Sequence, residues 1–227
     1  AVGASSPGDI IDVCAGSYPE MVNVNKTLTI RGAQAGIDAR NRPTTPAEEA
    51  VVSGNSGSTA FYVSASDTVI DGFTIQGNTN VNLFGAGVYI GANVAGTELL
   101  NNIIQNNIIG SYLSNNSPVN PMVISRNLFR NNTNPGAASG NGIYSDEYTA
   151  SGTLQNVLID NNTFDGNTNA GITLASTDGT KLQTNITISN NEFKNGGLGF
   201  GIYATNVTSS SISSNLFTNI NQGIRVN

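Results

Sequence analysis

The sequence predicts an all-β fold, a coil of about seven to eight turns in which each strand stacks in parallel on its equivalent in the preceding turn. The first observation is a repeated frame with two apolar residues five positions apart: Ile70/Ile75, Leu99/Ile104, Ile124/Phe129, Ile159/Phe164, Ile188/Phe193 and Ile212/Phe217. The second is that successive frames are 29, 25, 35, 29 and 24 residues apart, while the strands keep their length. Insertions therefore fall in loops. The third is that no amphipathic helix separates the strands.

Residues 1–57 are expected to form the N-terminal turns of this coil. Short alternating stretches broken by Gly and Pro predict strands rather than helices. They are Gly8–Val13, Gly16–Glu20, Val22–Val24 and Leu28–Ile30. Residues 32–50, which contain two prolines and mixed charge, predict a surface excursion. The strand pattern resumes at Val51.

Residues 58–227 carry the regular repeats, and each repeat has a second strand besides the apolar frame. This strand usually opens with glycine: Gly87–Ile90, Gly110–Leu113, Gly142–Ser145, Gly171–Leu174, Gly201–Ala204 and Gly223–Val226. Because side chains alternate along a strand, its second and fourth residues face inward and its third faces outward.

Asparagine marks the predicted corners of the coil. It stands three positions after the first apolar residue of five frames: Asn102, Asn127, Asn162, Asn191 and Asn215. At a tight corner asparagine tolerates the left-handed conformation, and stacked amides can bond from turn to turn as a structural ladder. A second column exchanges glycine for asparagine, which predicts a positive φ: Gly77, Asn106, Asn131, Gly166, Asn195 and Asn219.

Composition excludes several classes of function. The 227 residues have a net charge of −6 and no basic stripe, so a nucleic-acid partner is excluded. No run of about 18 apolar residues occurs, which predicts no membrane span. Histidine is absent, which removes a common general base and metal ligand, and Cys14 is the one cysteine, which excludes an intrachain disulfide.

Two segments resemble a known superfamily. Pro7–Val13 with Ala15–Glu20 resembles the common opening turn of the right-handed parallel β-helix, or pectin-lyase-like, superfamily. The frame Gly-Ile-x-x … Ile-x-x-Asn-x-Phe-x-x-Asn resembles its generic repeat. This likeness covers nearly the whole chain, and it implies a right-handed single-stranded parallel β-helix that forms one domain over residues 1–227. Members usually begin with a cap helix, of which Ala1–Ala4 would be the tail, and the chain stops within a strand. We therefore expect a fragment of a longer protein.

The resemblance leaves the activity open, because the superfamily includes lyases, hydrolases, epimerases, esterases and modules without catalysis. It implies that members acting on uronates need a base and cations around the substrate carboxylate, whereas this chain has nine Lys and Arg in total. An epimerase-type signature, Tyr-x-x-Asp-x-His, is incomplete: Tyr144-Ser145-Asp146-Glu147 has Glu at the Asp position, and no histidine follows. These departures favour a role without catalysis.

The outward column of the second strand is rich in tyrosine, which makes it the candidate ligand-binding face. Its aromatic members are Tyr62, Tyr89, Tyr112, Tyr144 and Tyr203, and Thr173 and Arg225 occupy the equivalent positions in two turns. A row of aromatic rings suits stacking on sugars or on a partner protein. The alternative is that a neighbouring loop covers the column and the rings serve packing alone.

Carboxylates in neighbouring loops form the candidate catalytic or metal-binding group. Asp146 and Glu147 lie in one loop, and Asp178 and Lys181 lie one turn further on. Two carboxylates can act as acid and base, and Asp146, Glu147 and Asp178 together could bind Ca²⁺ through oxygen ligands. The alternative is a solvated acidic loop, because Asp and Glu are mostly just exposed.

These observations favour a secreted or cell-surface module with a structural, adhesive or glycan-binding role. Its expected partners are neutral polysaccharides, or other copies of itself, bound along the coil axis or on the tyrosine face. Such a role requires no cofactor, and Ca²⁺ remains an option at the acidic loops. The alternative is a polysaccharide lyase, hydrolase or epimerase that uses the residues around Asp146.

Overall fold

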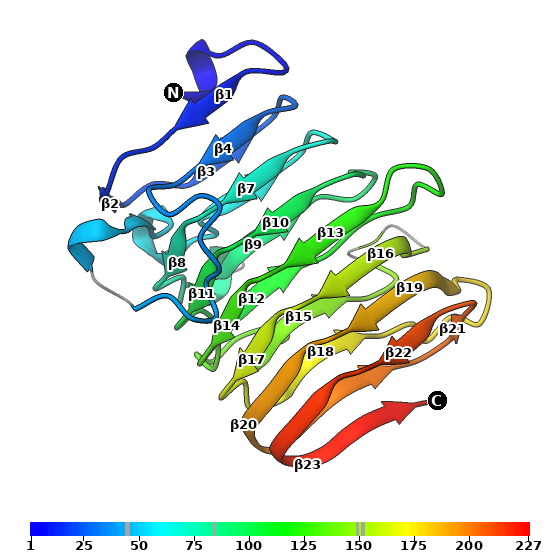
Figure 1. Ribbon diagram of the computed structural model, residues 1–227. Helices are drawn as coiled ribbons and strands as arrows, with labels where there is room; N and C mark the ends of the chain where they lie inside the picture. Colours follow the sequence, from blue (N-terminus) through cyan, green and yellow to red (C-terminus); the bar gives the residue numbers. More distant parts are fainter. Residues whose placement is uncertain (44–45, 84, 149, 151–152) are drawn as a thin grey trace.

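The computed structural model describes residues 1–227 except 44–45, 84, 149 and 151–152. Its chain winds into a coil of stacked strands, with the N-terminus at one end and the C-terminus at the other (Figure 1). Each strand pairs in parallel with its equivalents in the neighbouring turns, in the order of the chain. The all-β parallel coil predicted from the repeat is confirmed.

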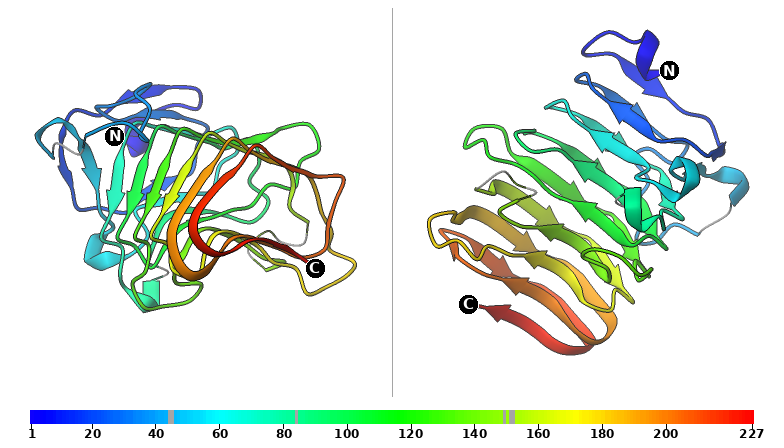
Figure 2. Two further views of the ribbon diagram at one scale, coloured as in Figure 1. Left: turned by 60° about the horizontal axis from the view of Figure 1, so that its bottom comes forward. Right: turned by 180° about the vertical axis from the view of Figure 1, so that it is seen from behind.

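The strands form three faces, which the views in Figure 2 show from the side and from behind. The first face contains β1 (Ile10–Asp12), β4 (Thr29–Arg31), β7 (Val69–Asp71), β10 (Glu98–Leu100), β13 (Met122–Ser125), β16 (Gln155–Asp160), β19 (Gln183–Ser189), β21 (Val207–Thr208) and β22 (Ser211–Ser213). The second face contains β2 (Gly16–Tyr18), β5 (Ala50–Val52), β8 (Thr74–Gln76), β11 (Ile103–Gln105), β14 (Leu128–Arg130) and β17 (Thr163–Asp165).

The third face contains β3 (Val22–Val24), β6 (Phe61–Val63), β9 (Ala86–Ile90), β12 (Ile109–Tyr112), β15 (Asn141–Ser145) and β18 (Ala170–Leu174). Two long strands, β20 (Glu192–Ala204) and β23 (Leu216–Val226), bend from the second face into the third and join them in one sheet. Short 3₁₀ turns interrupt the connections: η1 (Val2–Ala4), η2 (Pro46–Glu48), η3 (Asn55–Gly57) and η4 (Val81–Leu83). None of the helices in the described part of the chain is long and apolar enough to cross a membrane.

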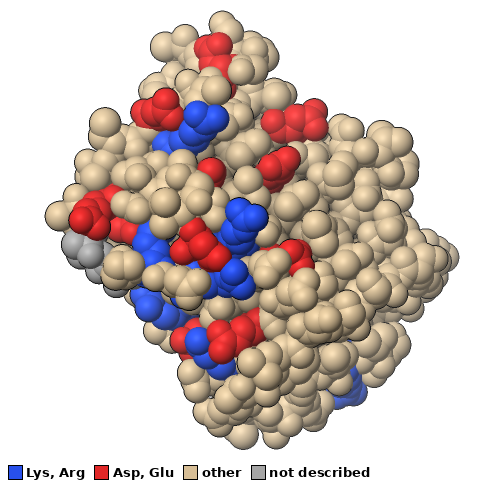
Figure 3. Space-filling view, viewed as in Figure 1, with Lys and Arg blue, Asp and Glu red and all other residues tan. Residues whose placement is uncertain are grey.

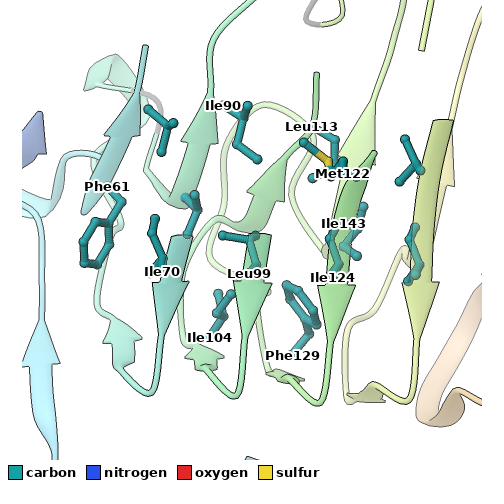
Figure 4. Packing of buried hydrophobic residues seen from close by; sticks show 14 of the residues in the cluster. Phe61, Ile70, Ile90, Leu99, Ile104, Leu113, Met122, Ile124, Phe129 and Ile143 are labelled. Atoms are coloured by element: carbon teal, nitrogen blue, oxygen red, sulfur yellow. The ribbon is translucent and has the colours of Figure 1, made fainter. Parts of the chain in front are cut away.

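Inward-facing apolar side chains fill the coil in columns along its axis (Figure 4). Each fully buried Ile or Phe contributes roughly 1.5–3 kcal/mol to stability. A column of phenylalanine rings stacks with centroid separations of 5.0, 4.8 and 4.9 Å: Phe129, Phe164, Phe193 and Phe217. Gly142 makes room for this stack, because a Cβ there would lie 2.7 Å from Cδ1 of Phe164.

Asparagines stand in single file at the corner between the first and second faces. We call them the first asparagine ladder: Asn102, Asn127, Asn162, Asn191 and Asn215. Asn127 is typical, since its Oδ1 accepts from N (2.9 Å) and Nδ2 (3.2 Å) of Asn102. Its Nδ2 donates to O of Leu99 (2.8 Å) and to Oδ1 of Asn162 (2.9 Å). These bonds satisfy polar groups that would be costly if buried unpaired.

The left-handed conformation at this corner belongs to the residue before the ladder asparagine, not to the ladder residue itself as the sequence suggested. Asn101 has φ 54°, Arg126 has φ 58° and Asn161 has φ 55°. The neighbour makes the turn, and the ladder side chain points inward. At the corner after the second face the prediction is confirmed, since φ is positive throughout the expected column: Gly77, Asn106, Asn131, Gly166, Asn195 and Asn219.

A second asparagine ladder, which the sequence analysis missed, follows directly after that column. It consists of Asn78, Asn107, Asn132 and Asn167. Their amides repeat the bonding of the first ladder: Nδ2 of Asn107 donates to Oδ1 of Asn132 at 3.0 Å. Polar ladders therefore fix both corners that flank the second face.

The connection expected to be a surface excursion is in part a buried strap. The described residues of this connection, 32–43 and 46–49, run along the outside of the coil, and Ala50 already belongs to β5. N of Ala39 donates to O of Arg126, and the Ala39 side chain is fully buried against Ile103 and Leu128. Near its end, Arg42 and Glu49 form an ion pair at 2.9 Å with both side chains 3% exposed. The strap thus covers outward-facing residues of later turns.

Candidate functional site

The candidate ligand-binding tyrosines lie on the outer side of the third face, one above another. Strand register pairs Tyr62 with Tyr89, Tyr89 with Tyr112 and Tyr112 with Tyr144. The column follows from the repeat, because the residue between two inward-facing positions must point outward in every turn. We call these four residues the tyrosine strip.

The four rings contact one another along the whole strip. Ring centroids lie 5.4 Å apart for Tyr62 and Tyr89, 5.3 Å for Tyr89 and Tyr112, and 5.7 Å for Tyr112 and Tyr144. The interplanar angle increases from 11° to 51° to 83° along the strip. The rings therefore turn progressively, so the strip presents ring edges and hydroxyls as well as ring faces.

The accessibility of the strip changes along its length. Tyr62 is 37% exposed, Tyr89 and Tyr144 are half-buried, and Tyr112 is only 5% exposed. The loop before β15 covers Tyr112, whose hydroxyl donates to O of Ala137 at 3.3 Å. A covering loop, the packing alternative raised by the sequence, thus applies to the middle of the strip. The other three tyrosines keep exposed surface.

Tyr203 lies in the same column but is separated from the strip. Thr173 stands between Tyr144 and Tyr203 in the strand register, and its Oγ1 donates to Oδ1 of Asn141 at 2.7 Å. Tyr203 instead contacts Phe200, at 5.3 Å between centroids, and the guanidinium of Arg225 lies 5.9 Å from its ring centroid. The structure does not bring the fifth candidate tyrosine together with the other four.

Asp146 stands at the end of the strip. It follows β15 directly, and the hydroxyl of Tyr144 donates to its Oδ2 at 3.1 Å. N of Tyr148 donates to its Oδ1 at 2.9 Å, which fixes the orientation of the carboxylate. The side chain of Tyr148 itself is 80% exposed. Of the four acidic-loop candidates, Asp146 is the one that contacts a strip tyrosine.

Burial keeps Tyr89, Tyr112 and Tyr144 protonated at neutral pH. Burial raises the pKa of Tyr112 to about 12, and the nearby charge of Asp146 adds to this effect. Burial also raises the pKa of Tyr144, helped by the charge of Asp146 and the hydrogen bond to it. Burial raises the pKa of Tyr89 as well. These phenols act as hydrogen-bond donors at neutral pH and are poor bases.

Glu147 is buried and points away from the strip into the next loop. It is 6% exposed and accepts from Oγ1 of Thr177 and, at 3.2 Å, from N of Thr177. These hydrogen bonds lower the pKa of Glu147, because they favour its ionised form. An ionised carboxylate cannot donate a proton, so this residue is poorly suited to general acid catalysis.

Asp178 and Lys181 form a half-exposed pair of their own. Their charged groups lie 3.8 Å apart, and Asp178 also accepts from N and Oγ1 of Thr180, which lowers its pKa. In the described part of the chain, no three His, Cys, Asp or Glu residues lie close enough to hold a metal ion. Asp146, Glu147 and Asp178 are therefore not gathered into a three-carboxylate cluster that would hold Ca²⁺.

Charged side chains gather elsewhere, in a band along one side of the coil (Figure 3). The ion pairs of the described residues include Arg40 with Asp38, Arg42 with Glu49 and Lys194 with Glu192. Because acidic and basic side chains are mixed in it, the band offers no net positive surface for a polyanion. A separate apolar cavity of about 510 Å³ opens at the N-terminal end of the coil, and no candidate site residue lines it.

Comparison with known proteins agrees with this architecture. A family model described as a right-handed β-helix region matches residues 153–227. The crystal structure of an alginate lyase from Paenibacillus sp. str. FPU-7 is similar over 100% of this chain and 94% of that chain, with a TM-score of 0.54 and 15% sequence identity. A search of curated proteins found no match to the sequence. Together with the stacked parallel strands, these likenesses identify the fold of the chain as a right-handed parallel β-helix.

Proposed function

We propose that this β-helix is a non-catalytic, glycan-binding module of a secreted or cell-surface protein. A polysaccharide chain would lie along the tyrosine strip, parallel to the coil axis. The observation that carries the proposal is the register of Tyr62, Tyr89, Tyr112 and Tyr144, whose rings are in contact at a regular spacing of 5.3 to 5.7 Å. Repeated, equally spaced aromatic and hydroxyl groups suit a ligand that is itself a repeat.

The protonation states around the strip favour binding over catalysis. Cleavage of a glycan needs a base, or an acid and a base, with pKa values near the working pH. Here burial raises the pKa values of Tyr89, Tyr112 and Tyr144, and hydrogen bonds lower those of Glu147 and Asp178 in the neighbouring loops. These three phenols therefore stay neutral, and those with exposed hydroxyls suit hydrogen bonding to sugar hydroxyls. The polar, charge-poor composition of the chain supports a neutral glycan ligand.

Affinity gel electrophoresis on a panel of soluble polysaccharides tests this function. The wild-type chain should be retarded by at least one neutral glycan, and Tyr62→Ala with Tyr89→Ala should abolish the retardation. Tyr203→Ala is the matched control, because that residue lies in the same column beyond Thr173. Retardation that is the same in the double variant and the wild type would remove the tyrosine strip as the binding site.

The second candidate is a polysaccharide-active enzyme, which is favoured by the alginate lyase of the same fold. Its reaction would use Asp146 beside the hydroxyl of Tyr144. Product release from neutral and acidic polysaccharides, measured with and without added Ca²⁺, tests this candidate. Turnover that Asp146→Asn abolishes would establish the enzyme and overturn the non-catalytic proposal.

A further inference from the structure

Asp146 is the carboxylate in direct contact with the tyrosine strip. Its Oδ2 accepts from the hydroxyl of Tyr144 and its Oδ1 from the backbone N–H of Tyr148, so both oxygens are held in place. Glu147 is turned into the next loop by Thr177, and Asp178 is paired with Lys181. Glu147 and Asp178 therefore bond to residues outside the strip, whereas Asp146 bonds to Tyr144 at the end of the strip.

The charge of Asp146 acts on more than its direct neighbour. It contributes to the raised pKa of Tyr89, Tyr112 and Tyr144, which belong to three successive turns of the coil. Among the described carboxylates, Glu147 also acts on Tyr144, and it has the same sign. The field along this part of the strip is therefore negative.

We propose that Asp146 is a specificity-determining residue, which admits neutral glycans to the tyrosine strip and excludes those built from uronic acids. This inference rests on the proposed function. A uronate placed against Tyr144 would bring its carboxylate close to a fixed carboxylate of the same sign. Such repulsion is a common means of rejecting a wrong ligand. The hydrogen bond from Tyr144 also fixes which way that hydroxyl points, so Asp146 positions a sugar-binding group as well.

The test compares the wild type with Asp146→Asn for binding to a neutral β-glucan and to a polyuronate. The variant should bind the polyuronate about fivefold to tenfold more tightly at low salt, and this gain should shrink as salt is added, because screening weakens Coulomb repulsion. Binding of the β-glucan should change less than twofold. Asp12→Asn is the matched control, since it removes the same charge from an exposed position in the first turn. It should leave both affinities unchanged.

A second readout needs no glycan. Ionisation of the tyrosines, followed by ultraviolet difference absorbance, should begin at lower pH in Asp146→Asn than in the wild type or in Asp12→Asn. Equal polyuronate affinities in the two Asn variants, or a tyrosine titration that Asp146→Asn leaves unchanged, would overturn the assignment. If the wild type binds the β-glucan and the variant gains no polyuronate affinity, the specificity role alone is wrong. If neither protein binds any glycan, the proposed function is wrong as well.

Discussion

Single residues at the corners decide how this chain turns. Asn127 makes four ladder bonds across three turns of the coil, whereas the residue before it, Arg126, takes the left-handed conformation that the corner needs. Bonding and turning are thus divided between two neighbouring positions. The same division recurs at the other corner, where Asn131 turns the chain and Asn132 forms the second asparagine ladder.

Replacing a ladder asparagine should therefore cost more than replacing a turning one. Asn127→Ala leaves the amide of Asn102 and the carbonyl of Leu99 without their partner, which should lower the free energy of unfolding by roughly 1–3 kcal/mol. Asn131→Gly is the control and should change it by less than about 0.5 kcal/mol, because glycine adopts the positive φ freely. Urea denaturation of both variants measures the difference. Equal losses would contradict the division of roles.

At the residue scale, the two asparagine ladders show how much of the structure can be predicted from the sequence. The column of Asn102 to Asn215 stands out because each member is preceded and followed by an apolar residue at a fixed distance. The second ladder keeps an equally fixed distance, and both ladders include adjacent asparagines, such as Asn101-Asn102 and Asn106-Asn107, of which the first turns the chain. In such Asn-Asn pairs the sequence alone does not show which of the two side chains points inward. The hydrogen bonds in the structure show that it is the second asparagine of each pair.

At the scale of elements, the least predictable part is the strap of residues 32–49. Its prolines and charges are typical of a solvated loop, and the sequence contains no signal that Ala39 would cover Ile103 and Leu128, more than sixty positions later. Contacts across several turns depend on the path of the loop, which no periodic pattern encodes. The buried pair of Arg42 and Glu49 belongs to this path as well.

The contribution of the Arg42–Glu49 ion pair to the stability of the protein can be tested by substitution. Glu49→Gln leaves the guanidinium of Arg42 buried without a counter-charge, which should lower the free energy of unfolding by about 3–5 kcal/mol. Asp38→Asn breaks the other pair of the same loop, whose side chains are 27% and 28% exposed, and should cost less than about 1 kcal/mol. Thermal and urea unfolding of both variants checks the contrast. Similar losses in the two would show that the strap is not anchored through Glu49.

The sequence predicts the register of the strands that carry the tyrosine strip, but not the orientation of the tyrosine rings. Strand periodicity places Tyr62, Tyr89, Tyr112 and Tyr144 in one outward column. The rotation of successive rings and the burial of Tyr112 come from side-chain packing and from the loop that ends at β15, which vary between turns. The proximity of Tyr144 and Asp146 follows from their spacing along one strand end, although the sequence does not show that they bond.

At the scale of the whole molecule, the coil holds equivalent side chains at regular intervals. Parallel stacking fixes the separation of equivalent side chains, so a single outward position repeated in each turn becomes a regular array along the axis. Glycan binding on this architecture would depend on ligand length, because a longer chain reaches more of the exposed rings, Tyr62, Tyr89 and Tyr144, until the strip is spanned.

Isothermal titration of neutral oligosaccharides of increasing length tests this central claim most directly. Affinity should rise with ligand length, reach a plateau once the ligand spans Tyr62 to Tyr144, and lose this length dependence in Tyr89→Ala, which interrupts the strip. Affinity that is independent of ligand length, or a length dependence that Tyr89→Ala leaves intact, would contradict it.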